Sequence, residues 1–347
     1  MNFILRSARP SDVDHLYSVA QQFSLLNLPA DKNVLEHKID KSVKSFKGEL
    51  EKSHAKYMFV VEDIEESRVA GSSQIIAKHG NPGRPAFSFE VLKKERFSKD
   101  LGVGFIHQIL RLKLNEDGPS EIGGLVLDQN YRGRPERIGK LCSLGRFLYL
   151  GMHPDKFEKQ VYAQMAPPLT PEGRSHFWEA LGRRFTGMRY QEADTLSNQN
   201  KEFIRSLFPE EDIYLCLLDA QARLSMGHVN QETLPALHML QGVGFEQISE
   251  VDPFDGGPHI MCDVDKVSLV KEAEWLNYKP VESKGEFNDE ALIGVMREHE
   301  FVGGVSLYRK DGSEICLPEK TKKAMQLQSG EKVYMTPMRS KRAKGNG

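Results

Sequence analysis

Cysteine is scarce in this chain, with four residues among 347, and no two of them form a C-x-x-C pair. Thiols spaced this widely predict neither a disulfide framework nor a structural zinc site, and they fit a reducing compartment. The four are Cys142, Cys216, Cys262 and Cys316.

An excess of charge of one sign is also lacking, because 47 Lys and Arg residues stand against 49 Asp and Glu residues and leave a formal charge of −2. Nucleic acids favour strongly basic surfaces, so no nucleic-acid partner is expected. Nowhere do about 18 apolar residues run together, so no membrane span and no membrane partner are expected. The opening MNFILR has no basic region followed by a long apolar stretch, and no secretion signal is expected.

What the chain does have is 39% hydrophobic residues, enough for a substantial core, and a length that suits about two or three domains. Alternating apolar residues predict strands, and apolar residues repeating every three to four positions predict helices. Strands are predicted at 3–9, 57–62, 69–77, 87–91, 121–127 and 160–165, helices at 13–23, 34–46, 139–151 and 175–184, and a mostly extended stretch at 100–115.

The C-terminal part is predicted to be rich in β-structure. Residues 279–288 are charged, contain Pro and Gly, and are typical of a linker. Short strands are predicted beyond the linker at 292–297, 303–309, 314–317 and 332–337. We therefore expect a mixed α/β fold in three regions: a core over 1–195, a second α/β region over 196–278 and a small β-rich unit over 279–347.

The clearest chemical signal is an apolar strand that runs into a loop rich in Gly and Arg, which then opens a helix. Free N–H groups at a helix start and the positive end of its dipole favour an anion. Glycine lets the backbone approach a pyrophosphate, and the strand edge could bond an extended amide chain such as pantetheine. An ordinary turn is the alternative interpretation. The candidate residues are Leu125, Val126, Leu127, Arg132, Gly133, Arg134, Gly139 and Lys140.

This strand, loop and helix resemble the coenzyme A-binding motif of GNAT acyltransferases, whose loop reads Arg/Gln-x-x-Gly-x-Gly/Ala. From near residue 25 to near residue 270 the chain resembles the arginine N-succinyltransferases more specifically, and the FDGGP run (254–258) is far more specific than the loop. The segments that carry the resemblance are LNLPADKNVLEHKI, KSFKGELEKS, YMFVVED, LVLDQNYRG, SHFWEALGRRF, EADTLS, KEFIRSLFPEEDIYLCLL and VDPFDGGPHIMCDVD.

The resemblance implies a GNAT-like core and transfer of a succinyl group from succinyl-CoA to the α-amino group of arginine, in arginine degradation. Succinyl-CoA would be a co-substrate, and no permanently bound cofactor or metal is expected. The small-molecule partners would be an acyl-CoA and arginine or a related amine. A cytoplasmic location is expected, and the state of assembly stays open between a homo-oligomer and a hetero-oligomer.

The chain departs from the family pattern where relatives read Gly-Gln-Val-His-Pro, because it has Gly227-His228-Val229-Asn230-Gln231. The family's proton-transferring histidine maps onto Asn230, which cannot exchange a proton near neutral pH. If this segment is a strand, His228 and position 230 face the same side, and His228 could act instead. The alternative is a surface or packing histidine.

Two carboxylates are candidates for substrate binding. Glu90 replaces a family arginine, and an anion there would disfavour succinyl-CoA, although an ordinary solvated carboxylate is the alternative. Asp255 lies in the FDGGP run, and a guanidinium calls for carboxylates. Two further functions therefore stay open: an N-acyltransferase with another donor or amine, and a non-catalytic subunit or regulator that keeps the fold.

Overall fold

The computed structural model describes residues 1–22, 28–197, 201–281 and 286–338. The chain forms two compact units, each built from separate stretches of sequence. Unit 1 comprises Met1–Lys78, Ser120–Lys159 and Asp263–Gly347, and unit 2 comprises His79–Pro119 and Gln160–Cys262. The boundaries expected near residues 195 and 278 do not coincide with this division, because both units are assembled from segments far apart in the chain.

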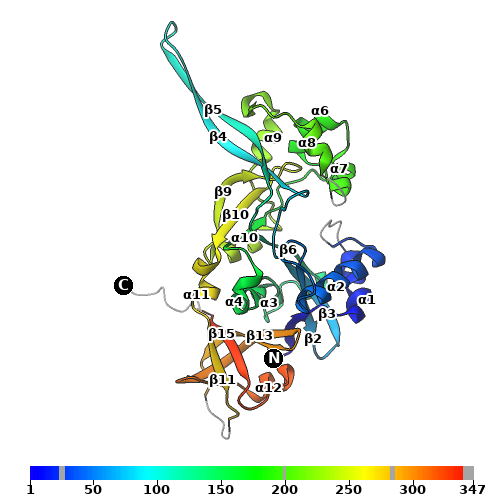
Figure 1. The fold of residues 1–347 in the computed structure, drawn as a ribbon, viewed down its shortest axis with the longest axis vertical. Coiled ribbons are helices and arrows are strands. Elements are labelled where there is room, and N and C mark those ends of the chain that lie inside the picture. Colours follow the sequence, from blue (N-terminus) through cyan, green and yellow to red (C-terminus); the bar gives the residue numbers. More distant parts are fainter. Residues whose placement is uncertain (23–27, 198–200, 282–285, 339–347) are drawn as a thin grey trace. The chain divides into compact units, whose positions relative to one another are not determined.

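Unit 1 is centred on antiparallel strands covered by helices on both faces (Figure 1). Met58 and Val60 pack with α1 and α2, while the alternate residue Phe59 contacts Tyr149 of α4 at a ring distance of 5.6 Å. Asp31 caps α2 by accepting bonds from the N–H groups of its first turn. The elements are β1 (Phe3–Ser7), β2 (Lys56–Asp63), β3 (Arg68–Ile76), β6 (Ser120–Leu127), α1 (Val13–Ala20), α2 (Lys32–Phe46), α3 (Ile138–Leu144) and α4 (Arg146–Met152).

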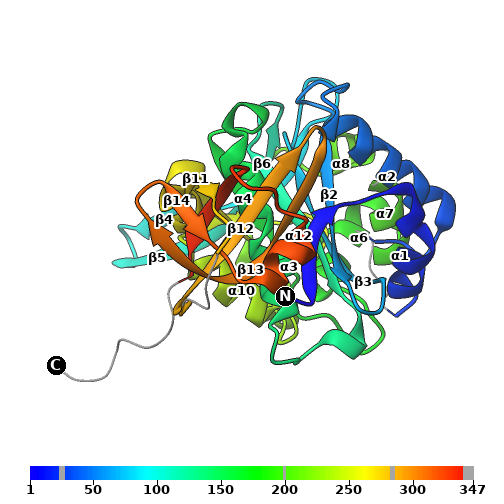
Figure 2. The same cartoon turned by 90° about the horizontal axis from the view of Figure 1, so that it is seen from below.

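The C-terminal strands of unit 1 close into a ring in the order β12-β15-β11-β14-β13, with β13 pairing back to β12 (Figure 2). Apolar side chains fill this ring, and β13 also pairs with β1, where Leu5 faces Gly303. The expected β-rich tail is therefore joined to the N-terminal sheet by backbone hydrogen bonds. The elements are β11 (Glu274–Tyr278), β12 (Asp289–Arg297), β13 (Glu300–Asp311), β14 (Glu314–Cys316), α12 (Glu319–Met325) and β15 (Lys332–Pro337).

The strands of unit 2 are hydrogen-bonded in the order β7-β10-β9-β4-β5-β8, with short helices on one face. Its core stacks Trp178 on Phe254 at a ring distance of 5.4 Å, beside Phe89 of β4. The strands are β4 (Ala86–Ser98), β5 (Val103–Asn115), β7 (Gln160–Gln164), β8 (Ile213–Tyr214), β9 (Glu246–Val251) and β10 (Pro258–Asp263); the helices are α5 (His176–Ala180), α6 (Gly182–Thr186), α7 (Tyr190–Ser197), α8 (Glu202–Leu207), α9 (Ala220–Ser225) and α10 (Leu234–Gln241).

Most elements expected from periodicity are confirmed, and the differences have physical causes. The strand expected at 87–91 extends to Ser98, because β4 continues into a hairpin with β5 whose two faces are largely exposed and therefore carry no alternating pattern. The helix expected at 139–151 is divided at Gly145 into α3 and α4. The helix expected at 13–23 ends at Ala20, and residue 23 lies outside the described residues. No helix in the described part of the chain has the length and apolar character of a bilayer span.

A buried arginine holds the helical layer against the sheet in unit 1. Arg146 opens α4 and is 2% exposed. Its guanidinium donates to the carbonyl oxygens of Gln74 on β3 (3.1 Å), Gly123 on β6 (2.8 Å) and Ser143 on α3 (2.9 Å). Burial lowers the pKa of Arg146 to about 10, so the group still carries its charge at neutral pH. One side chain therefore joins three elements.

Replacing Arg146 with Met should lower the free energy of unfolding by about 2 to 4 kcal/mol, because three carbonyl oxygens lose a charged, buried donor. The free energy of unfolding of Arg146→Lys should lie between those of wild type and Arg146→Met, since an ammonium group cannot reproduce the planar set of donors of a guanidinium. Urea titration followed by circular dichroism measures the change. Arg183→Met is the matched control, since this exposed helical arginine pairs with Glu179 and should change stability by less than about 0.5 kcal/mol. Equal stability of Arg146→Met and wild type would contradict this role.

Candidate functional site

The strand that precedes the Gly/Arg loop carries a β-bulge. Val126 pairs with Ser72 and Gly123 pairs with Gln74, so Gly124 and Leu125 together oppose the single residue Ser73. Gly124 has a φ of +57°, a conformation that favours glycine. A bulge turns backbone N–H and C=O groups away from the regular ladder, and such groups are suited to bonding an extended amide chain or a developing oxyanion.

The loop after β6 is stabilised by a buried carboxylate and presents arginines to solvent. Asp128 is fully buried and accepts bonds from the Asn130 N–H (2.9 Å) and from Arg68 (3.2 Å). Arg134 is exposed, donates to the Asn130 carbonyl (3.0 Å) and lies over the Tyr131 ring at 4.2 Å. Exposed Arg132 donates to the Leu127 carbonyl at 3.4 Å. These contacts with the loop backbone and with Tyr131 orient both guanidinium groups, which remain accessible to an anion.

The start of α3 adds further groups suited to an anion. Arg137 precedes the helix in the left-handed region with a φ of +56°, and it is exposed. Helix N-termini leave their first N–H groups without partners in the helix, which here places those of Ile138 and Gly139 at the loop. Lys140 follows on the first turn and is partly exposed. Pro135 in the loop contributes no N–H.

The segment with His228 and Asn230 belongs to unit 2 and is not a strand. It forms an irregular turn between α9 and α10, so the expectation that the two side chains share one strand face does not apply. His228 is exposed, and its Nδ1 lies 3.1 Å from the Met226 carbonyl oxygen. The Asn230 side-chain oxygen accepts from the Thr233 N–H (2.8 Å), and its amide donates to the Pro167 carbonyl (3.4 Å). Asn230 thus organises the approach to α10.

The FDGGP turn lies directly beside this segment, because the Gly227 N–H donates to the Gly256 carbonyl at 2.8 Å. Gly256 has a φ of +76°, and a Cβ on Gly257 would lie 2.3 Å from the Met165 carbonyl oxygen, so both glycines are required by the backbone. Asp255 accepts from the Gly257 N–H (2.8 Å). The turn therefore positions one carboxylate at a tightly packed corner.

Three aspartates of unit 2 interact electrostatically at this corner. Burial, and then repulsion from Asp252, raises the pKa of Asp255 well above its usual range. The same two causes raise the pKa of Asp194 to about 7. Both carboxyls therefore favour the protonated form in the absence of a cation, and a bound cation would lower both pKa values.

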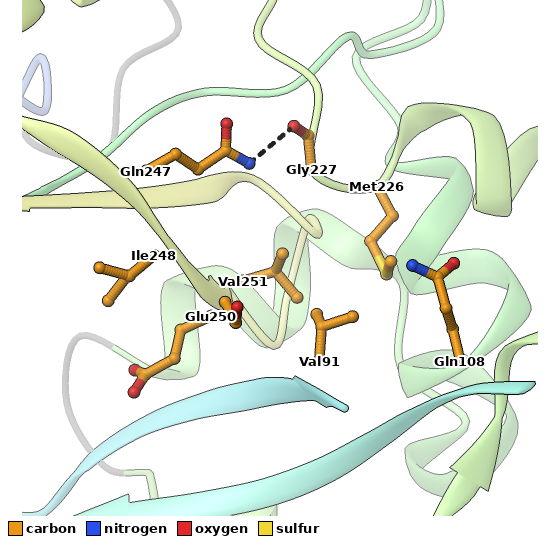
Figure 3. A pocket seen from close by; sticks show the side chains of 9 residues that line it. Val91, Gln108, Met226, Gly227, Gln247, Ile248, Glu250 and Val251 are labelled. Carbon is orange, nitrogen blue, oxygen red and sulfur yellow. Dashed lines mark hydrogen bonds between the residues drawn. The ribbon is translucent and has the colours of Figure 1, made fainter. Parts of the chain in front are cut away.

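A pocket of about 430 Å³ opens in unit 2 where β9 separates from β4 (Figure 3). Its floor is mostly apolar or neutral, and Gln247 donates to the Gly227 carbonyl at 3.4 Å along one wall. The pocket thus reaches the turn that leads to His228 and Asn230. The lining residues are Val91, Gln108, Met226, Gly227, Gln247, Ile248, Ser249, Glu250 and Val251.

Glu250 at the edge of the pocket is the centre of a polar network. It accepts from Ser88 (2.9 Å) and from Lys113, and its Oε2 lies 3.9 Å from Nδ1 of the buried His259. The interaction with His259, together with the bonds from Lys113 and Ser88, lowers the pKa of Glu250 to about 2. Glu90 lies directly beside it in the register of β4 and β9. The network keeps Glu250 ionised.

Comparison with known proteins gives a consistent answer. The family described as arginine N-succinyltransferase beta subunit matches residues 3–269. This chain belongs to the arginine N-succinyltransferase family. An arginine N-succinyltransferase from Photorhabdus laumondii is 30% identical over 341 residues, covering 96% of this chain and 98% of the relative. One from Citrobacter koseri is 32% identical over 336 residues and covers 96% of each.

The fold of this family member is also similar to a solved structure. Subunit AI of the arginine/ornithine succinyltransferase from Pseudomonas aeruginosa superimposes with a TM-score of 0.84 at 25% identity, covering 97% of this chain and 99% of that one. The expected family and mixed α/β fold are confirmed.

The structure groups the predicted residues of this succinyltransferase-family chain into two sets. Leu125, Val126 and Leu127 on β6 and the residues from Arg132 to Lys140 lie together in unit 1, as their sequence order requires. Glu90, His228, Asn230 and Asp255 lie in unit 2. Sequence reasoning missed Glu250, His259 and Arg146. An acidic residue in a strand has no motif of its own, and only the closeness of Glu250 to the specific FDGGP run could have drawn attention to it.

The low pKa of Glu250 predicts how acid weakens the fold. A carboxyl whose folded pKa lies below its unfolded value of about 4.3 contributes stability above that value, and the contribution is lost as the pH falls towards 2. Glu250→Gln should therefore reduce stability at pH 7 by about 2 to 3 kcal/mol and lose less than wild type between pH 5 and 2. Urea unfolding at a series of pH values measures both. Glu246→Gln, at an exposed position on the same strand, is the control. Parallel acid profiles for Glu250→Gln and wild type would rule the network out as the cause.

Proposed function

We propose that this chain transfers a succinyl group from succinyl-CoA to the α-amino group of arginine. The observation that carries the proposal is the family match over residues 3–269, together with a bulged strand that leads into an arginine-rich loop and a helix start. In the reaction the neutral amine attacks the thioester carbonyl, a tetrahedral oxyanion forms, and the coenzyme A thiolate leaves while the new amide remains on arginine.

The donor-binding role falls to unit 1 in this proposal. The bulge at Gly124 and Leu125 supplies backbone groups for the pantetheine amides and for the oxyanion. Gly133 and Gly139 let the phosphates approach the backbone, and Arg132, Arg134 and Lys140 add charge-assisted bonds. The buried Asp128 supports this role, because it accepts a hydrogen bond from the Asn130 N–H and so fixes the loop, while the guanidinium groups stay accessible.

The acceptor-binding role falls to carboxylates of unit 2. A guanidinium prefers carboxylate partners, and a cation bound at the FDGGP corner would favour the ionised forms of Asp194 and Asp255, whose pKa values burial and Asp252 raise. We therefore assign recognition of arginine to Asp255 and its neighbours. Glu90 stays a candidate for acyl-group selectivity, because it takes the place of a family arginine and belongs to the charged face around Glu250.

The proton path is where this chain differs from its relatives. Asn230 cannot accept the amine proton, and its side chain already bonds Thr233 and Pro167. His228 is exposed two residues earlier and can exchange a proton with solvent. We propose that His228 or water moves the proton while Asn230 orients the turn. We also propose a cytoplasmic location, since all four cysteines are free thiols and these persist in reducing compartments.

Coenzyme A binding should depend on the loop charges. Arg132→Glu places an anion against the phosphates and should weaken binding by about 1.5 to 3 kcal/mol, the scale of a charge-assisted hydrogen bond. Isothermal titration calorimetry with coenzyme A measures the change. Arg84→Glu reverses an exposed arginine of unit 2 and should leave affinity unaltered. Equal affinities of Arg132→Glu and wild type would remove the loop from the site.

Turnover should respond to the two residues of the proton path in opposite directions. Asn230→His should raise kcat about tenfold or more, and His228→Ala should lower it, since acid–base catalysis contributes about 10²–10⁴-fold. Free thiol released from succinyl-CoA in the presence of arginine, ornithine or lysine measures the rate and the preferred acceptor. His238→Ala, at an exposed position on α10, is the control. A wild-type chain that binds coenzyme A but releases no thiol with any acyl-CoA and amine is a non-catalytic subunit.

A further inference from the structure

A buried histidine that has no part in the proposed function lies near the start of β10 in unit 2. His259 follows the FDGGP turn directly and is 3% exposed. Its Nδ1 lies 3.9 Å from Oε2 of Glu250, whereas its Nε2 has no hydrogen-bond partner among the described residues. Leaving a buried polar atom unpaired costs stability, so we expect Nε2 to serve a group that is not part of the fold.

The carboxylate of Glu250 determines which ring nitrogen of His259 carries the proton. The polar network described above lowers the pKa of Glu250 to about 2, so this carboxylate is ionised at neutral pH. A carboxylate that faces Nδ1 favours the tautomer with its hydrogen on Nδ1, which leaves the lone pair of Nε2 as an acceptor. The Tyr162 ring packs against the imidazole with a ring distance of 5.5 Å and restricts its rotation. An imidazole oriented by a carboxylate in this way is suited to act as a base.

Two backbone hydrogen bonds connect His259 to the turn that contains Asn230. The Met165 N–H donates at 3.0 Å to the carbonyl of Pro258, the residue before His259. The Asn230 N–H donates at 3.0 Å to the carbonyl of Ala166. Met165 and Ala166 are consecutive, so His259 lies close to the position that the family resemblance gives to a proton-transferring histidine.

We propose that His259, held by Glu250, is the final acceptor of the proton that the α-ammonium group of the acceptor must lose. This inference rests on the proposed function, and it adds an end point to the route through water. Because Nε2 is enclosed, the proton reaches it through one water molecule, a distance over which a base can act. The adjacent carboxylate stabilises the imidazolium that forms.

The reaction balances with this single base. His259 takes one proton from the α-ammonium group, and the neutral amine attacks the thioester carbonyl carbon. The C–S bond then breaks, the second amine proton leaves with the coenzyme A thiol, and the imidazolium returns its proton to solvent. No oxidant, metal or further co-substrate is needed for these steps.

Thiol release from succinyl-CoA and arginine by the full chain tests the proposal. His259→Gln keeps a polar side chain but cannot take up the proton, so kcat should fall about 100-fold or more, within the range of general acid–base catalysis. Affinity for coenzyme A and the circular dichroism spectrum should stay unchanged. His228→Ala should lower kcat less than His259→Gln does. His238→Gln, the same change at an exposed position on α10, is the matched control and should leave kcat unaltered.

A histidine restored at position 230 distinguishes a proton acceptor from a structural residue. In the Asn230→His background a second base is present near His259, so His259→Gln should cost about tenfold or less instead of about 100-fold. Glu250→Gln should behave in the same way with a smaller loss, because it removes the group that stabilises the imidazolium. A residue that only supports the fold would cost the same factor in both backgrounds.

The outcomes separate this inference from the proposed function. A wild type that releases no thiol with any acyl-CoA and amine overturns the proposed function, and the role of His259 with it. If wild type acylates arginine and His259→Gln keeps its kcat, or loses the same factor with Asn230 and with His at position 230, the role of His259 alone is overturned.

Discussion

The guanidinium of Arg146 is the contact on which unit 1 depends. It joins β3, the bulged strand β6 and α3 through three carbonyl oxygens. Gly123, one of these acceptors, immediately precedes the bulge at Gly124 and Leu125. Arg146 therefore fixes the position of the bulge and of the loop that begins after Leu127. Arg146 itself lies outside the proposed donor site.

That constraint explains why the loop tolerates an unusual sequence. The loop contains Pro135, and Arg137 adopts a left-handed conformation, yet both ends of the loop are held. Asp128 anchors the first end by accepting from Asn130 and Arg68, and the buried side of α3 anchors the second. Variation between two fixed ends would change which side chains meet a phosphate at the proposed donor site without moving β6.

Sequence reasoning succeeded where a local pattern decides the outcome. The alternating strands, the Asp31 cap and the strand–loop–helix order are local, and the family resemblance rests on contiguous segments. Sequence reasoning failed where pairing between residues far apart in the chain determines the structure. The β4–β5 hairpin has no clear apolar period because most of its side chains beyond residue 92 are exposed, and the two units interleave segments that no linker separates. The polar network around Glu250 is formed by residues of four strands, so no sequence spacing could predict it. Its other members are Ser88, Lys113 and His259.

Asn230, which the family resemblance sets in the place of a proton-transferring histidine, has a structural role in the local fold. A histidine and an asparagine can both hydrogen-bond a backbone N–H, but only histidine also exchanges a proton near neutral pH. Here the Asn230 oxygen accepts from Thr233 and its amide donates to Pro167, so both polar ends of the side chain already have structural partners. The turn before α10 is therefore stabilised by hydrogen bonds that do not need a titratable side chain at position 230. The groups proposed to bind the donor and the acceptor are therefore independent of the residue at position 230.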